Sequence, residues 1–154
     1  MISKGYSLFE LLIVLAILVI VVSLVSVDIS SIFTKNNLTI VSKELSTDLN
    51  YAKQKAIEES NNWIIYFNDT SYEIYSELNP AEILVKKDYS DKQVYFGDSG
   101  GNYSPVNNVV EFNSNGGLAL NSIEIIGMHN KDNESIYIVI NSSTGRVTIQ
   151  NTNP

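Results

Sequence analysis

The residues best suited to chemistry stand at the start of the chain, which opens MISKGYSLFELLIVLAILVIVVSLVSV. Glu10 lies at the edge of an aliphatic run, Leu11 to Val27, that holds no charge over 17 positions. A carboxylate costs about 2.5–3.5 kcal/mol at the centre of a membrane helix and less near its end. Lys4 and Gly5 precede Glu10 by a few residues, with the polar residue Ser7 between them and Glu10. Glu10 therefore needs an explanation that the apolar run alone does not supply.

Three interpretations compete for this segment. A secretory signal peptide has an apolar stretch of about 7–15 residues, so this one is too long, and the sequence from Asp28 onward is a poor cleavage site. A plain membrane anchor fits the length, because the 20 residues from Leu8 to Val27 suffice to cross about 30 Å of hydrocarbon. Lys4 would then mark the cytoplasmic side. This second interpretation accounts for the hydrophobicity but leaves Glu10 unexplained.

The third interpretation comes from the order of the residues. Lys4-Gly5-Tyr6-Ser7-Leu8-Phe9-Glu10, followed at once by an aliphatic helix, resembles the class III signal of the type IV pilin and pseudopilin family. The resemblance implies that a membrane-embedded prepilin peptidase cleaves after Gly5 and methylates the new N-terminus at Tyr6. It also implies that recognition and assembly depend on Lys4, Leu8 and Glu10.

Physical chemistry supports the roles that the resemblance implies. Gly5 has no side chain, so a protease can approach its backbone closely. Removal of Met1–Gly5 leaves a positively charged amine on Tyr6, and Glu10 lies one helical turn further along the same face. When helices stack with an axial stagger, the amine of one subunit can meet the carboxylate of its neighbour, and in apolar surroundings an unpaired charge is costly. Glu10 would thus set the register of assembly.

Two departures from the family pattern stand out. Tyr6 occupies a position where Phe is commoner, which adds a hydroxyl and keeps the ring. The first proline of the chain is Pro80, so the N-terminal helix lacks the proline kink that many major pilins carry. The second departure favours a minor subunit or a pseudopilin.

The elements that position these residues continue the helical pattern. Small and aliphatic side chains recur at steps of three and four, which indicates an amphipathic helix with one buried stripe: Leu38, Val41, Leu45, Leu49, Ala52 and Ala56. We predict one helix over Ser7–Glu59, about 80 Å long at 1.5 Å per residue. Its weak point is Asp28–Asn37, which is rich in Ser, Thr and Asn.

After Asn61-Asn62 the period changes to two, and eight short strands follow with tight connections. The predicted strands are 63–67, 71–75, 82–87, 93–96, 109–112, 122–126, 135–140 and 146–150. Short links favour an antiparallel arrangement, and no βαβ alternation is present. The predicted fold class is α+β, with a long N-terminal helix packed on a C-terminal antiparallel sheet domain. The predicted divisions are a leader (1–5), a transmembrane or filament-core helix (6–27), its amphipathic continuation (28–60) and the β domain (61–154).

Other residues offer little chemistry. The chain has no Cys, and its one histidine, His129, lies in a stretch predicted as the solvated loop Gly127–Asn133, so neither a zinc site nor a catalytic triad is expected. Gly97–Pro105 is predicted as a flexible loop, since it lacks the lysine and the strand-to-helix setting of a phosphate cradle. Some pseudopilins bind calcium through acidic C-terminal loops. Here the candidate oxygen ligands do not have the spacing of a calcium loop; they are Asp98, Asn102, Asp132, Asn133 and Glu134. We expect no catalytic residue, no metal and no cofactor.

The net charge of −7 repels phosphate backbones. Some minor pilins of competence systems bind DNA through basic C-terminal residues. In residues 131–154 of this chain the only basic residues are Lys131 and Arg146, against Asp132 and Glu134. No nucleic acid partner is therefore expected.

The C-terminal part resembles the closing half of H-type pseudopilins and FimT-like minor pilins, through Phe112-Asn-Ser-Asn-Gly-Gly117 and the segment from Ser135 to Ile149 with its Thr-Gly-Arg. Arg146 is expected on the surface.

The resemblances imply a structural subunit of a type IV pilus or type II secretion pseudopilus. Its partners would be prepilin peptidase, other pilin subunits, the membrane, and indirectly an assembly platform and an ATPase. It would lie in the cytoplasmic membrane with the C-terminal domain outside, then in the filament. A membrane-anchored binding module that never polymerises, or a DNA-uptake minor pilin, is the alternative.

Overall fold

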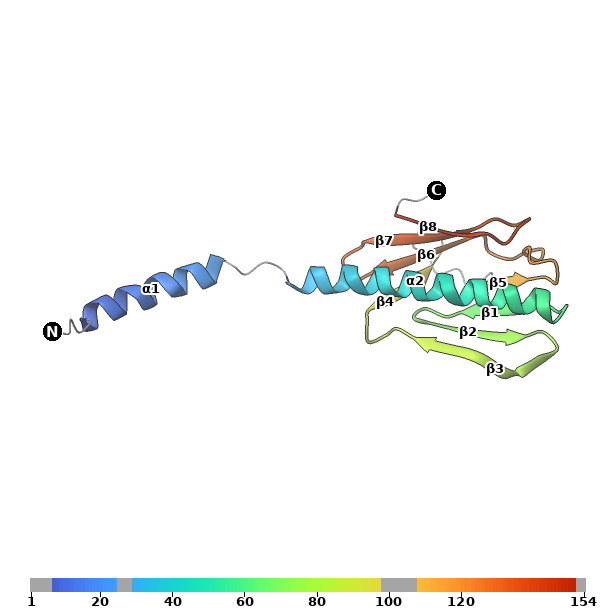
Figure 1. Cartoon of the computed structure of the whole chain (residues 1–154), viewed down its shortest axis with the longest axis horizontal. Helices are drawn as coiled ribbons and strands as arrows, with labels where there is room; N and C mark the ends of the chain where they lie inside the picture. Colours follow the sequence, from blue (N-terminus) through green and yellow to red (C-terminus); the bar gives the residue numbers. More distant parts are fainter. Residues whose placement is uncertain (1–6, 25–28, 98–107, 152–154) are drawn as a thin grey trace, which may run out of the picture. The chain divides into compact units, whose positions relative to one another are not determined.

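The computed structural model describes residues 7–24, 29–97 and 108–151, and the chain divides into two compact units, Met1–Ile32 and Phe33–Pro154 (Figure 1). Helix α1 spans Leu8–Leu24 and helix α2 spans Ile29–Glu58. Residues 25–28 lie outside the description, so the predicted continuity of one helix over Ser7–Glu59 stays a prediction. The predicted leader, residues 1–5, also lies outside the described residues.

Helix α2 buries the stripe that its sequence predicts. Its six small and aliphatic side chains are at most 1% exposed: Leu38, Val41, Leu45, Leu49, Ala52 and Ala56. The helix ends at Glu58, and Ser60 in the turn that follows adopts a positive φ of 51°. The N–H of Asn61 then reaches back to the carbonyl of Ala56 at 3.2 Å, which satisfies one of the last helical carbonyls.

In the described part of the chain, eight strands follow α2 and pair antiparallel in two four-stranded sheets. The first sheet has the order β3-β2-β1-β5, with β1 Trp63–Phe67, β2 Ser71–Ser76, β3 Asn79–Asp88 and β5 Val109–Phe112. The second has the order β4-β6-β7-β8, with β4 Val94–Gly97, β6 Ile125–Asn130, β7 Ser135–Ile140 and β8 Val147–Gln150. The α+β fold predicted from the sequence is confirmed, and each of the eight predicted strands has a counterpart.

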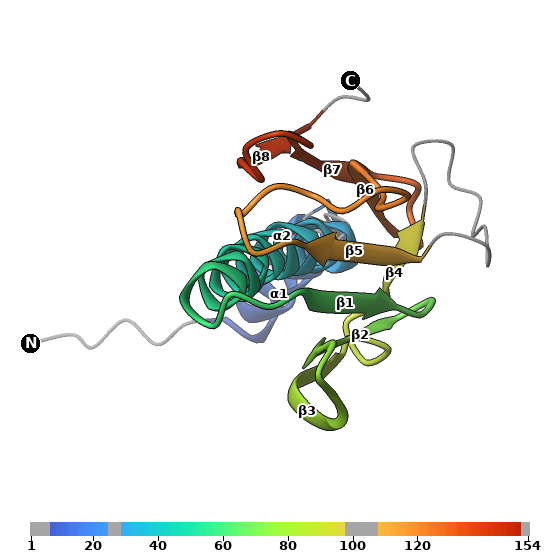
Figure 2. The ribbon, with the colours of Figure 1, turned by 90° about the vertical axis from the view of Figure 1, so that its right-hand side faces the viewer.

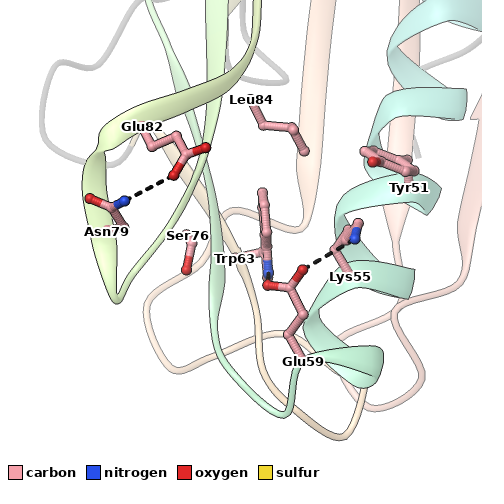
Figure 3. Close-up of a pocket in the computed structure, with 8 residues that line it drawn as sticks. All are labelled: Tyr51, Lys55, Glu59, Trp63, Ser76, Asn79, Glu82 and Leu84. Carbon is pink, nitrogen blue, oxygen red and sulfur yellow. Dashed lines mark hydrogen bonds and ion pairs between the residues drawn. The ribbon is translucent and has the colours of Figure 1, made fainter.

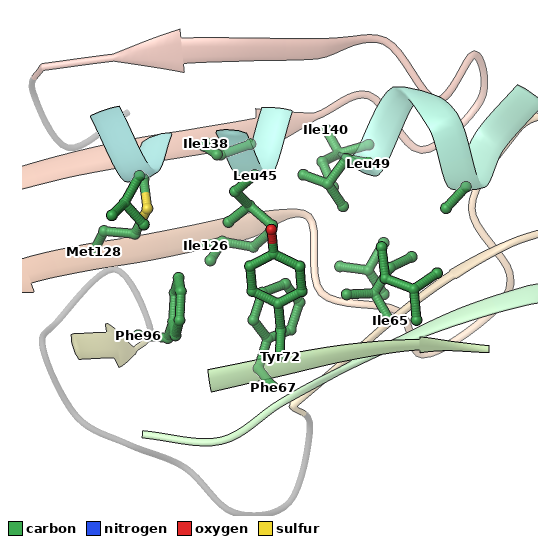
Figure 4. Close-up of a cluster of buried hydrophobic side chains, with 14 of the residues drawn as sticks. Leu45, Leu49, Ile65, Phe67, Tyr72, Phe96, Ile126, Met128, Ile138 and Ile140 are labelled. Atoms are coloured by element: carbon green, nitrogen blue, oxygen red, sulfur yellow. The ribbon is translucent and has the colours of Figure 1, made fainter. Parts of the chain in front are cut away.

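The core lies between α2 and the two sheets. Figure 2 looks along α2 and shows β1–β3 and β6–β8 on different sides of it. Strands of both sheets bury side chains in this core, among them Ile65 in β1, Ile126 in β6 and Ile138 in β7. Figure 4 shows Leu45 of α2 among side chains from both sheets, including Tyr72 and Ile126. One continuous apolar core therefore holds the body together.

Two loops pack against each other at the end of the body where α2 terminates. The N–H of Leu118 donates to the carbonyl of Ser142 at 2.8 Å, and Lys53 Nζ of α2 donates to the carbonyl of Thr144 at 2.7 Å. Gly145 has a φ of 60° and lies against the carbonyl oxygen of Gly116, so closely that a Cβ at Gly145 would overlap it. The two glycine-containing segments that resemble pseudopilins in the sequence are thus direct neighbours. Arg146 beside them is exposed, as predicted.

Candidate functional site

The predicted processing and assembly residues begin at the N-terminus. Lys4, Gly5 and Tyr6 lie outside the described residues. Leu8 and Glu10 both lie in the first turn of α1 and are exposed. The structure therefore describes Leu8 and Glu10, which are predicted to act in recognition and assembly, whereas cleavage between Gly5 and Tyr6 stays a prediction.

Helix α1 starts with a capping arrangement around Ser7. The backbone N–H of Phe9 donates to Ser7 Oγ at 3.3 Å, and the N–H of Glu10 donates to the Ser7 carbonyl at 3.0 Å. Ser7 and Glu10 have the S-x-x-E spacing of a capping box, and a carboxylate in the first turn is favourable beside the positive end of the helix dipole. Among the described residues, the Glu10 carboxylate has no hydrogen bond or ion pair. Glu10 thus has a local role in starting the helix, and its charge remains available to another chain.

The rest of α1 is apolar on every side. Large hydrophobic side chains from Leu8 to Val22 are between 45% and 83% exposed. Glu10 is the single charged residue among the 17 of the helix. A helix that is apolar all round belongs in an apolar surrounding.

No helix in the described part of the chain combines the length and the apolar character needed to cross a membrane.

A cluster of polar side chains joins α2 to the first sheet, and no motif in the sequence pointed to it. Tyr72 donates its hydroxyl to Asp48 Oδ2 at 2.6 Å, and Tyr89 donates to Glu44 Oε2 at 2.8 Å. Lys87 Nζ lies 2.9 Å from Asp48 Oδ2. Burial raises the pKa of both phenols, and donation to a carboxylate raises the pKa of each further. The cluster anchors the helix to the sheet, and both tyrosines are at most 3% exposed.

We expect the body to lose stability above pH 10. The pKa of a free tyrosine is 10.0, so in the unfolded chain both phenols ionise there, whereas in the folded chain they keep their protons. The folded state then binds more protons, so the free energy of unfolding falls by up to about 1.4 kcal/mol per pH unit for each tyrosine. Urea unfolding measured from about pH 9 to 11 tests this. The free energy of unfolding of the Tyr72→Phe/Tyr89→Phe variant should fall less steeply with pH than that of the wild type. Equal slopes for the two proteins would show that these two tyrosines do not cause the loss.

The prediction that His129 lies in a solvated loop is wrong. The strand β6 continues through Asn130, and His129 pairs there with Tyr95 on one side and Ser135 on the other. Its Nδ1 lies 2.7 Å from Ser135 Oγ, and its Nε2 is buried without a partner among the described residues. The missed signal was the inward alternation of Ile126, Met128 and Asn130, which are all buried.

The turn after β6 holds three of the oxygen-bearing residues weighed for calcium. Asn130 Oδ1 accepts the backbone N–H of Asp132 at 3.0 Å and of Glu134 at 2.9 Å. The Asp132 carboxylate accepts from Thr34 Oγ1 at 2.7 Å, and Glu134 lies 3.5 Å from Lys35 Nζ. These acids therefore dock the turn on α2. No three metal-ligating side chains gather within the described ranges, and Asp98 and Asn102 fall outside them.

The chain matches no protein-family model and no curated protein sequence. Its structure is similar to a crystal structure of the type IV minor pilin FimU from Pseudomonas aeruginosa, with a TM-score of 0.59 and 18% identity over 75% of this chain and 90% of FimU. A second crystal form of FimU gives a TM-score of 0.55 and 18% identity over 73% of this chain and 92% of that one.

These two structures concern the fold of the chain. The likeness extends over most of both chains, so it concerns the whole architecture and not a single supersecondary motif. The narrower resemblance to H-type pseudopilins stays a prediction. The chain has the α+β fold of a type IV minor pilin.

Proposed function

We propose that the chain is a minor pilin or pseudopilin, a structural subunit of a type IV pilus or a type II secretion pseudopilus. Prepilin peptidase cleaves it after Gly5 and methylates Tyr6. The observation that carries the proposal is the charge distribution of α1, in which Glu10 is the single charge in a helix whose apolar side chains are exposed. Such a helix requires lipid or sister helices around it. The minor-pilin fold of the chain supports the same function.

Assembly follows from the pairing of Glu10. In the membrane the apolar helix anchors the subunit, with the β domain outside. In the filament the same helix packs against sister helices, and Glu10 pairs with the amine of Tyr6 on a neighbour. An assembly platform and a separate ATPase supply the work, so this chain needs no catalytic residue of its own.

The cleavage site gives the first test. The chain produced together with a prepilin peptidase should lose Met1–Gly5 and gain one methyl group, as read by intact mass. Gly5→Leu should abolish cleavage, because a branched side chain blocks close approach to the scissile backbone. Ser3→Leu places the same bulk inside the leader and should leave cleavage unchanged.

The rival function is a membrane-anchored binding module that never polymerises, which needs the same apolar helix but no processing. Retention of Met1 in the presence of active peptidase would refute the pilin proposal and favour this rival.

A further inference from the structure

A cavity lies between the C-terminal half of α2 and the β2–β3 hairpin. Figure 3 shows Trp63 standing between side chains of the helix on one side and of the hairpin on the other. The lining residues are Tyr51, Lys55, Glu59, Trp63, Ser76, Asn79, Glu82 and Leu84. The cavity therefore combines aromatic and aliphatic walls with charged groups.

The size of the cavity limits what it can hold. Its volume is about 290 Å³. Pockets for drug-sized ligands and cofactors run from about 300 to 1,000 Å³, so this one suits a single side chain or a group of similar size.

The charges in the cavity do not balance. Glu59, just past the end of α2, already has two partners, since Lys55 Nζ of α2 lies 3.1 Å from Glu59 Oε1 and Trp63 Nε1 of β1 donates to Glu59 Oε2 at 3.3 Å. Glu82 stands on the hairpin wall and accepts only from the amide of Asn79, at 3.0 Å. No cation reaches Glu82 within the described part of the chain. The cavity lining thus holds two carboxylates and one ammonium group, and that ammonium group pairs with Glu59 and not with Glu82.

The surroundings add to the negative potential. The cavity lies beside the C-terminal end of α2, where the helix dipole is negative. Glu58 follows on the same helix end, and Glu77 is linked there by its N–H to the carbonyl of Asn62 at 3.0 Å. A second cavity of the same volume, between α2 and the second sheet, differs in this respect, because its charged residues Lys35 and Glu134 pair with each other at 3.5 Å. This second cavity therefore lacks the excess negative charge of the first.

We infer that this cavity binds a lysine or arginine side chain of another polypeptide. The aliphatic stem of such a side chain packs on Leu84 and on the aromatic wall, and the cationic head reaches the Glu82 carboxylate. The aromatic residues Tyr51 and Trp63 in the lining favour a cation over a neutral group of the same shape. That the donor is a neighbouring filament subunit rests on the proposed function, whereas recognition of the cationic side chain does not.

Binding can be measured directly, because Trp63 lines the cavity and is the sole tryptophan of the chain. The full chain in detergent micelles is titrated with the peptides acetyl-Gly-Lys-Gly-amide and acetyl-Gly-Arg-Gly-amide while Trp63 fluorescence is recorded. We expect a saturable change with both peptides and a weakening with added salt. The norleucine analogue, which keeps the stem without the charge, should give no saturable change. An equal response to norleucine, or none to the basic peptides, would overturn the inference.

A variant pair locates the site. Glu82→Gln removes the charge but still accepts from Asn79, and its position is exposed, so the fold should persist. We expect at least a tenfold weaker affinity for the lysine peptide. Glu124→Gln neutralises an exposed glutamate outside the cavity and should leave the affinity unchanged. Equal affinities of the Glu82 variant and the wild type would refute the site. Retention of Met1 with normal peptide binding would instead refute only the pilin proposal.

Discussion

Filaments formed in the presence of a Glu10→Gln variant are expected to contain almost none of this subunit, although the variant is cleaved as efficiently as the wild type. Without the carboxylate, the amine of the neighbouring Tyr6 is left unpaired in an apolar surrounding. Breaking a buried ion pair costs about 3–5 kcal/mol, and each 1.4 kcal/mol is a factor of ten, so incorporation should fall by roughly two to four orders of magnitude. The ratio of subunit in sheared filaments to subunit in membranes measures this.

Glutamine separates the two roles of Glu10. Ser7 caps the helix with its own hydroxyl and the Glu10 carboxylate makes no hydrogen bond among the described residues, so Glu10→Gln keeps the start of α1. Glu10→Asp keeps the charge on a shorter stem and should restore part of the incorporation. Normal incorporation of the glutamine variant would show that Glu10 acts only in starting the helix, and it would contradict the ion pair.

Gly145→Ala is expected to lower the free energy of unfolding of the body strongly. At its φ of 60° an L-residue is strained, and the new Cβ overlaps the carbonyl oxygen of Gly116, which belongs to backbone and cannot rotate away. Left-handed backbone costs about 1–2 kcal/mol and overpacking about 1–3 kcal/mol, so we expect a loss of about 2–5 kcal/mol. Urea unfolding followed by Trp63 fluorescence measures it.

Gly116→Ala is the matched control for this loss. Gly116 also has a positive φ, of 81°, but a Cβ there would meet the end of the Ile57 side chain at 2.7 Å. A side-chain terminus can move to another rotamer, so the backbone strain remains while most of the overlap is relieved. The free energy of unfolding should therefore fall less in Gly116→Ala than in Gly145→Ala. Equal losses would show that the positive φ alone, and not the close approach of the two loops, accounts for the loss of stability in Gly145→Ala.

The sequence alone determined the features that depend on local spacing. The three- and four-residue steps from Leu38 to Ala56 predicted the buried face of α2, because helical periodicity places those side chains on one side whatever they pack against. Period-two runs between turn residues located eight strands for the same reason. The motif around Gly5 and Glu10 is likewise linear, so it can be recognised without any tertiary contact.

Local spacing failed where a strand carries polar residues. The polar composition of the stretch from Gly127 to Asn130 predicts a loop, yet this stretch continues β6. Pairing with β4 and β7 on both sides satisfies its backbone, and this outweighs the weak strand propensity of Gly and Asn.

Only the tertiary structure decided how distant segments meet. It divided the eight strands into two sheets, with β4 beside β6 and β5 beside β1. It brought Tyr72 to Asp48, Gly145 to Gly116, and the hairpin residue Glu82 to the cavity beside Trp63. Such contacts join residues far apart in the chain, and they depend on how whole elements pack around a shared core. Periodicity within one element carries no information about that packing, so no reading of the sequence alone could supply it.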